Sequence, residues 1–85
     1  MIQITSAQMA KAALLEGEVL VYKPHGEQVT FLSLKSQYRI TKFTMNVRYN
    51  ISFDELGEIL ETNNVYIFEK DDDLEINQEF KKLIQ

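Results

Sequence analysis

The sequence predicts a single α+β domain: an antiparallel sheet of four or five strands with an N-terminal helix, a short helix before the last strand and a C-terminal helix. Apolar and polar residues alternate over residues 41–51, which is the period of a strand with one buried face. Two other segments start with helix-capping residues and continue with apolar residues at helical spacing. The 85 residues contain no linker or repeat and suffice for one core, so we take residues 1–85 as one domain.

The first predicted helix covers residues 6–16. With Thr5 as the N-cap, Gln8 lies at the third helical position, which is the spacing of a capping box. Several alanines and Leu14 form its apolar stripe, and Gly17 is placed to end it. We expect this helix to pack closely against the sheet.

A hairpin is predicted next, with strands over residues 18–23 and 28–35. Pro24 and Gly26 in the segment between them favour a turn. Both strands carry apolar residues at consecutive positions, so each is covered on both faces or lies at an interface between copies. Together with the small size of the chain, this indicates a homo-oligomer.

Residues 38–51 are compatible with two structures. The apolar positions are even before Thr41 and odd from Phe43 onward, so the pattern requires a bulge, a bend or a turn. One possibility is a single long, bent strand, and the other is a hairpin that turns near residues 44–46. The single strand preserves the alternation from Phe43 to Ile51, and it is our prediction.

The clearest local signal begins at Ser52. Ser52 and Glu55 have the spacing of a capping box, and Asp54 adds negative charge where the helix dipole favours it. The helix ends before residues 62–64, and a strand follows over residues 65–69. An exposed acidic turn and a C-terminal helix from about Asn77 complete the prediction.

The residue types present do not form a recognisable catalytic or metal site. Cysteine is absent, His25 is the one histidine, and no glycine-rich phosphate loop, dinucleotide fingerprint or zinc pattern occurs. The run 71–73 of three aspartates lacks the ligand spacing of a calcium loop. We therefore expect no enzyme activity, no metal and no cofactor.

Charge is distributed unevenly along the chain, whose net charge is -4. Residues 1–48 hold six Lys or Arg against three Glu, and residues 49–85 hold three Lys against ten Asp or Glu. An acidic total disfavours nucleic-acid binding, because neutralised phosphates supply much of that affinity. The sequence has no signal peptide pattern and no membrane-spanning apolar run, so we expect a cytoplasmic protein.

The predicted central strand gathers residue types that suit a nucleotide. Arginine and lysine bind phosphate oxygens, asparagine hydrogen-bonds base edges, and tyrosine stacks on bases. The same residues would also suit the solvated face of an ordinary sheet. The set comprises Lys42 and Arg48, with Arg39, Asn46, Asn50, Tyr22, Tyr38 and Tyr49 nearby in the sequence.

The order of elements resembles a broad family of small phage-encoded proteins that includes the sponge proteins directed against Thoeris defence. The resemblance covers most of residues 5–70: the helix 7–17 followed at once by the strand 19–23, and the short helix from 52–56 followed by the strand 65–69. Where that family has aromatic residues, usually Trp, the nearest aromatic residues here are Tyr22 and Tyr66. The resemblance implies these two as ligand contacts.

Taken together, these observations predict a phage or prophage protein that counters a host defence by sequestering a small signalling nucleotide without turning it over. The candidate ligand-binding residues are Tyr22, Lys23, Arg39, Lys42, Arg48 and Tyr66. The alternative is an acidic protein that inhibits a host enzyme or nuclease by direct contact, in the manner of anti-CRISPR proteins. In that case the acidic second half of the chain would form the contact surface.

Overall fold

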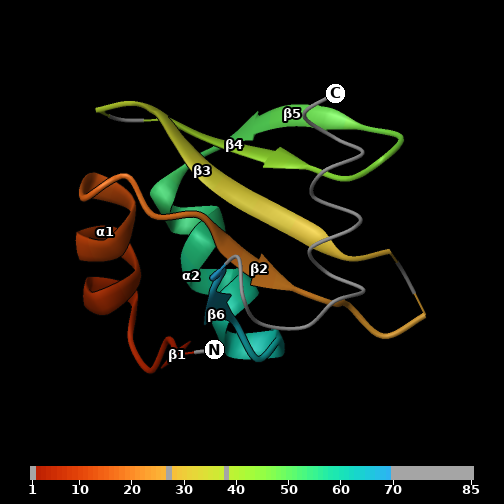
Figure 1. Cartoon of the computed structure of the whole chain (residues 1–85), viewed down its shortest axis with the longest axis horizontal. Helices are drawn as coiled ribbons and strands as arrows, with labels where there is room; N and C mark the ends of the chain where they lie inside the picture. The colour runs from red at the N-terminus through yellow and green to blue at the C-terminus, as the bar shows by residue number, and fades with distance from the viewer. Residues whose placement is uncertain (1, 27, 38, 70–85) are drawn as a thin grey trace.

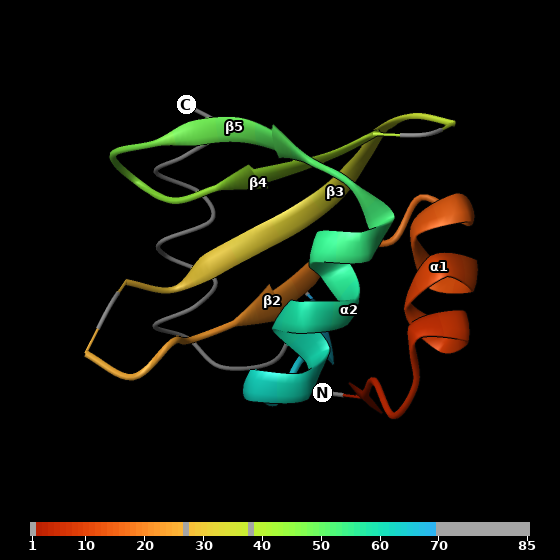
Figure 2. The ribbon, with the colours of Figure 1, turned by 180° about the vertical axis from the view of Figure 1, so that it is seen from behind.

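The computed structural model describes residues 2–26, 28–37 and 39–69. They form a six-stranded, fully antiparallel sheet with two helices on one of its faces (Figures 1 and 2). The elements in chain order are β1 (Ile2–Gln3), α1 (Ala7–Leu15), β2 (Leu20–Tyr22), β3 (Thr30–Ser36), β4 (Arg39–Phe43), β5 (Arg48–Ile51), α2 (Phe53–Thr62) and β6 (Tyr66–Ile67). The α+β class and the antiparallel sheet are thus confirmed, and the sheet has one strand more than the upper expectation.

The strand order across the sheet is β1-β6-β2-β3-β4-β5. The β2–β3, β3–β4 and β4–β5 neighbours are consecutive in the chain, whereas β6 returns to insert between β2 and β1. Backbone bonds from the Ile4 N–H to the Val65 carbonyl (2.8 Å) and from the Phe68 N–H to the Val19 carbonyl (2.7 Å) extend this pairing. The two ends of the described chain therefore lie together at one side of the sheet, and β5 forms the opposite edge.

Helix α1 begins one residue later than the sequence predicted. Its N-cap is Ser6, whose hydroxyl accepts a hydrogen bond from the Met9 backbone N–H (3.1 Å), so the assignment of Thr5 as the cap was wrong. The predicted end is confirmed. Gly17 has φ +90°, its N–H bonds to the Leu14 carbonyl (3.0 Å), and the Glu18 N–H bonds to the Ala13 carbonyl (3.0 Å), which together form a Schellman motif.

Helix α2 begins as predicted. The Glu55 backbone N–H donates to the Ser52 hydroxyl (3.2 Å), and Asp54 and Glu55 occupy the first turn. A cation–π contact joins the two helices, because the Lys11 ammonium lies 5.4 Å from the centre of the Phe53 ring. Both helices pack their apolar side chains on the same face of the sheet, which we call the helix face.

The sheet is apolar on both faces in its middle strands, as predicted. Leu20, Leu32 and Ile40 point to the helix face and are 0% exposed. On the other face Phe31 stacks on Phe43 with ring centres 5.5 Å apart. Phe31 also meets the edge of Phe68 at 5.7 Å.

The prediction of one long strand over residues 38–51 was wrong, and the alternative hairpin is present. β4 ends at Phe43 and β5 begins at Arg48, with the Thr44 N–H bonded to the Val47 carbonyl (2.9 Å). The reversal exposes three odd-numbered side chains that a single strand would have buried. They are Met45, Val47 and Tyr49, which are 48%, 51% and 46% exposed. The predicted acidic turn at 71–73 and C-terminal helix from Asn77 lie outside the described residues.

Candidate functional site

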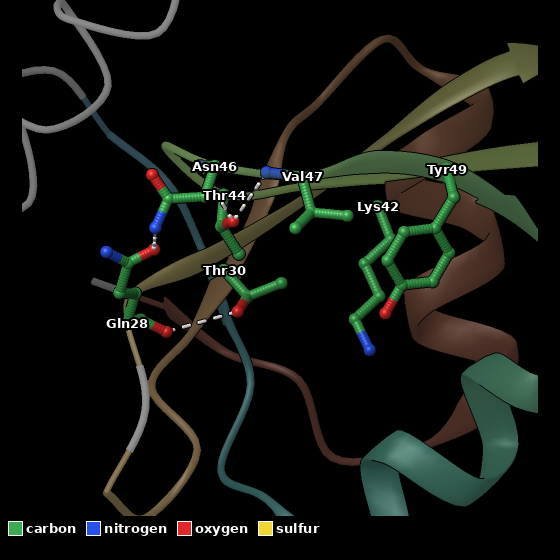
Figure 3. Close-up of a pocket in the computed structure, with 7 residues that line it drawn as sticks. All are labelled: Gln28, Thr30, Lys42, Thr44, Asn46, Val47 and Tyr49. Carbon is green, nitrogen blue, oxygen red and sulfur yellow. Dashed lines mark hydrogen bonds between the residues drawn. The ribbon is translucent and has the colours of Figure 1, made fainter.

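A cleft lies on the helix face, where α2 leaves the ends of β3, β4 and β5 uncovered (Figure 3). Its volume is about 340 Å³, within the range of small-molecule sites but open to solvent. The lining residues come from three neighbouring strands and their loops. They are Gln28, Thr30, Lys42, Thr44, Asn46, Val47 and Tyr49.

The strand register explains why these residues share one face. Lys42 pairs with Leu32 on one side and with Tyr49 on the other, and directly paired residues of antiparallel strands point to the same face. Because Leu32 belongs to the core beneath the helices, Lys42 and Tyr49 point to the helix face as well. On the helix face, the row of paired residues that runs across the sheet is thus apolar at Leu32 on β3 and polar at Lys42 on β4.

Hydrogen bonds hold the far wall of this cleft in place. The Thr44 hydroxyl accepts bonds from the backbone N–H groups of Asn46 and Val47, both at 3.2 Å. The Asn46 amide then donates to the Gln28 side-chain oxygen (3.3 Å), which links the β4–β5 turn to the β2–β3 loop. Figure 3 shows this chain of contacts opposite Lys42. The polar groups of the wall are thus fixed before any ligand arrives.

Lys42 supplies the positive charge of the cleft. Its ammonium lies 5.2 Å from the centre of the Tyr49 ring, and the two polar ends point the same way in Figure 3. A hydrogen bond with Tyr49 raises the pKa of Lys42, and this effect is larger than the lowering caused by partial burial. Interaction with Tyr22 raises the pKa of Lys42 further. Lys42 is therefore a firmly protonated cation, suited to holding an anion and unsuited to acting as a nucleophile.

A second cleft, of about 390 Å³, lies on the other side of Lys42 against α2. Its wall includes the carboxylates of Glu55 and Glu58, with Tyr22 and Pro24 from β2 and the following loop. The two clefts differ in charge. Among the described residues, the first is lined by one cation and by no carboxylate, whereas the second is lined by Lys42 together with the two acidic residues Glu55 and Glu58.

The structure brings only part of the predicted site together. Tyr22 and Lys42 line the same cleft, but Tyr22 is 3% exposed, so little of its ring is available to a base. Tyr49, which the site prediction omitted, contributes the exposed ring beside Lys42. Its position beside Lys42 depends on the β4–β5 register, for which the sequence pattern gave no direct signal.

The other candidates lie elsewhere. Arg48 pairs with Phe43 and its guanidinium lies 5.1 Å from that ring, on the face opposite Lys42. Arg39 stands at the start of β4 and lines a separate hollow with Asn50, Ile51 and Ser52. Tyr66 pairs with Val21 and packs with the core of the opposite face, and Lys23 is exposed beyond β2. Tyr38 is outside the described residues.

The described chain shows no arrangement for metal binding or for crossing a membrane. In residues 2–26, 28–37 and 39–69, no three His, Cys, Asp or Glu side chains are grouped closely enough to bind a metal ion. No helix among these residues has the length and apolar character of a membrane span.

Comparison with known proteins adds no relative, since neither a family model, nor a curated protein, nor a solved structure matches the chain. The class that the observations define is therefore a small α+β protein with an open polar cleft beside Lys42.

Proposed function

We propose that the protein binds and sequesters a small signalling nucleotide, without chemical turnover, in the cleft beside Lys42. The observation that carries the proposal is the ammonium of Lys42 in a cleft that, among the residues the structure describes, no carboxylate lines. Around it are hydroxyl and amide groups of the kinds that bind phosphate oxygens and base edges. The exposed ring of Tyr49 offers a surface on which a base can stack.

The charges of the two clefts favour one orientation of the ligand. A phosphate on the side of Gln28 and Asn46 meets Lys42 and neutral donors. A phosphate on the other side would face Glu55 and Glu58, which repel it. We therefore assign the phosphate to the first cleft and the base to the neighbourhood of Tyr49.

The resemblance to phage sponge proteins supplies the biological setting of this proposal. A phage or prophage protein that holds a host signalling nucleotide would lower its free concentration and so counter the defence that depends on it. Such a role needs binding alone. It is compatible with a cleft that offers donors, one cation and a ring.

The first test is a thermal-shift screen against cyclic mononucleotides, cyclic dinucleotides and ADP-ribose derivatives. A ligand present at about a hundred times its dissociation constant adds about 2.7 kcal/mol to the free energy of unfolding, which shifts the melting temperature of so small a domain by several degrees. The bound compound should be recovered unchanged after denaturation. If no compound shifts the melting temperature, sequestration of these nucleotides is refuted.

Three variants then locate the site. Lys42→Met should abolish the shift, while Lys35→Met, which removes an equal charge from an exposed position on β3, should retain it. The third variant combines Arg39→Ala with Arg48→Ala and tests the residues predicted from the sequence. Loss of binding in the third variant with normal binding by Lys42→Met would move the ligand away from this cleft.

A second function is favoured by the exposed acidic side chains of α2. Asp54, Glu55, Glu58 and Glu61 are all exposed on this one helix, a surface suited to a basic protein partner. An inhibitor of this kind would be recovered with its target from a host lysate. Its capture should weaken in the combined variant Asp54→Asn, Glu58→Gln and Glu61→Gln, and should be unaffected by Lys42→Met.

A further inference from the structure

The two edges of the sheet are unequal. One edge is β1, which has only two residues and so offers little backbone for pairing. The other is β5, four residues that pair on one side with β4 and, within the described residues, with no strand on the other. Strand edges of this kind are open to pairing with another chain unless charges, prolines or bulges protect them.

Strand β5 lacks these protections. It contains no lysine or proline, and its one cation, Arg48, is turned onto the Phe43 ring of its own sheet at 5.1 Å. Beside the edge, Val47 and Tyr49 are 51% and 46% exposed. An exposed backbone edge thus coincides with exposed apolar side chains, which favours a protein partner over solvent.

The hydrogen-bond pattern shows which backbone groups face outward. The Val47 carbonyl accepts from the N–H of Thr44, the residue that follows β4, so Val47 points its backbone groups inward. Since these directions alternate along an antiparallel strand, Tyr49 and Ile51 also bond toward β4. Arg48 and Asn50 therefore present their N–H and C=O groups to the free edge.

This edge is complementary to itself. When two copies of β5 run antiparallel about a two-fold axis, one register sets Arg48 opposite Asn50 of the other copy, and each such pair exchanges both of its backbone bonds. Tyr49 then lies opposite Tyr49 on the helix face, and Val47 lies opposite Ile51. A shift by two residues in one direction would place Arg48 against Arg48, and like charges directly opposed are destabilising. A shift by two in the other direction would leave Asn50 against Asn50 as the one bonded pair within β5, in place of two Arg48–Asn50 pairs. The favoured register thus avoids charge repulsion and covers the exposed apolar side chains.

We propose that β5 pairs with β5 of a second copy of this chain, in the register that sets Tyr49 against Tyr49, so that one continuous antiparallel sheet runs through a two-fold dimer. This proposal does not depend on the nucleotide. The pairing bonds use backbone groups that face away from the cleft, although the contact also includes the side chains of Val47 and Tyr49, which line the cleft. The dimer is expected in the ligand-free protein.

The mass of the ligand-free full chain, measured by light scattering at micromolar to sub-millimolar concentrations, tests the proposal. The wild type should be dimeric. Asn50→Pro removes an outward N–H that β4 does not use and should give a folded monomer, whereas Asn50→Ala keeps that N–H and should remain dimeric. Circular dichroism establishes that each variant is folded.

Cross-linking tests the register independently of the proline variant. The chain has no cysteine, so Tyr49→Cys introduces one thiol per copy. Directly opposed residues bring these thiols within disulfide distance, and oxidation should give a covalent dimer. Leu15→Cys, at a somewhat more exposed position on α1, should not cross-link. A monomeric wild type, a dimeric and folded Asn50→Pro variant, or cross-linking through position 15 and not 49 would each overturn the proposal.

Discussion

Thr44 stabilises the turn on which the β4–β5 hairpin depends, and its replacement by valine tests that role. Its hydroxyl oxygen accepts bonds from the N–H groups of Asn46 and Val47, each at 3.2 Å. Valine has nearly the same shape and a similar preference for strands, so Thr44→Val removes the acceptor and little else. The variant therefore measures the two hydrogen bonds of the turn.

The decrease in the free energy of unfolding that we expect for Thr44→Val follows from the solvent exposure of these two hydrogen bonds. A protein hydrogen bond contributes about 0.5–1.5 kcal/mol net, and the lower value applies here because both N–H groups can bond to water when the hydroxyl is gone. Two bonds then give a loss of about 1 kcal/mol in the free energy of unfolding. In a domain of this size the melting temperature should fall by about 4–8 °C.

The assay is thermal and urea unfolding followed by circular dichroism, with Thr41→Val as the matched control. Thr41 lies on β4 and is also half-buried, but its hydroxyl bonds to none of the described residues. The melting temperature of this variant should differ from that of the wild type by less than about 2–4 °C, because surface substitutions commonly change stability by less than about 0.5 kcal/mol. Equal melting temperatures for the two variants would refute the role given to the Thr44 hydroxyl.

Two further predictions concern the glycines and Lys42. Gly17→Ala should lower the free energy of unfolding by about 1 kcal/mol, because φ at this position is +90°. Gly57→Ala, inside α2, should raise the free energy of unfolding by about 0.5–1 kcal/mol, because an added Cβ there meets no atom within 4 Å. Denaturant melts in which both variants shift the same way would contradict these expectations. The raised pKa of Lys42 means that its charge stabilises the fold below the ordinary lysine pKa of 10.5 and that this contribution is lost as the pH rises through the folded-state value. The difference in free energy of unfolding between the wild type and Lys42→Met should accordingly be constant from neutral pH to about pH 9 and shrink above pH 10.5. Urea melts at each pH measure this difference. If it already shrinks near neutral pH, the pKa of Lys42 is lowered and not raised.

The helices could be predicted because their signals are local. Ser52 and Glu55 place a hydroxyl and a backbone N–H one turn apart, and Gly17 adopts the left-handed conformation that favours glycine. The N-terminus of α1 was misplaced by one residue, since Thr5 and Ser6 are both capping residues and spacing alone chose the wrong one. Local residue types therefore predict the ends of α1 and α2 to within one residue. They do not predict which elements these helices pack against.

The hairpin could not be predicted in the same way. Two-residue turns between strands usually carry glycine or Asn-Gly, because the favoured turn types need positive φ. Here the turn residues are Met45 and Asn46, no described non-glycine residue has positive φ, and the Thr44 hydroxyl supplies the stabilising bonds. The usual sequence signal is therefore absent, while the alternation of residues 43–51 continues through the turn by coincidence.

That turn decides which side chains meet in the candidate site. Along one continuous strand, even and odd residues point to opposite faces, so Lys42 would share a face with Arg48 and lie opposite Tyr49. In the hairpin, Lys42 pairs with Tyr49, and Arg48 pairs with Phe43 on the other face. The composition of the cleft, with one cation beside an exposed ring, thus follows from the register that the turn sets. The same turn makes β5 the edge of the sheet and turns the backbone groups of Arg48 and Asn50 outward, so the proposed ligand site and the proposed dimer contact have a common structural origin.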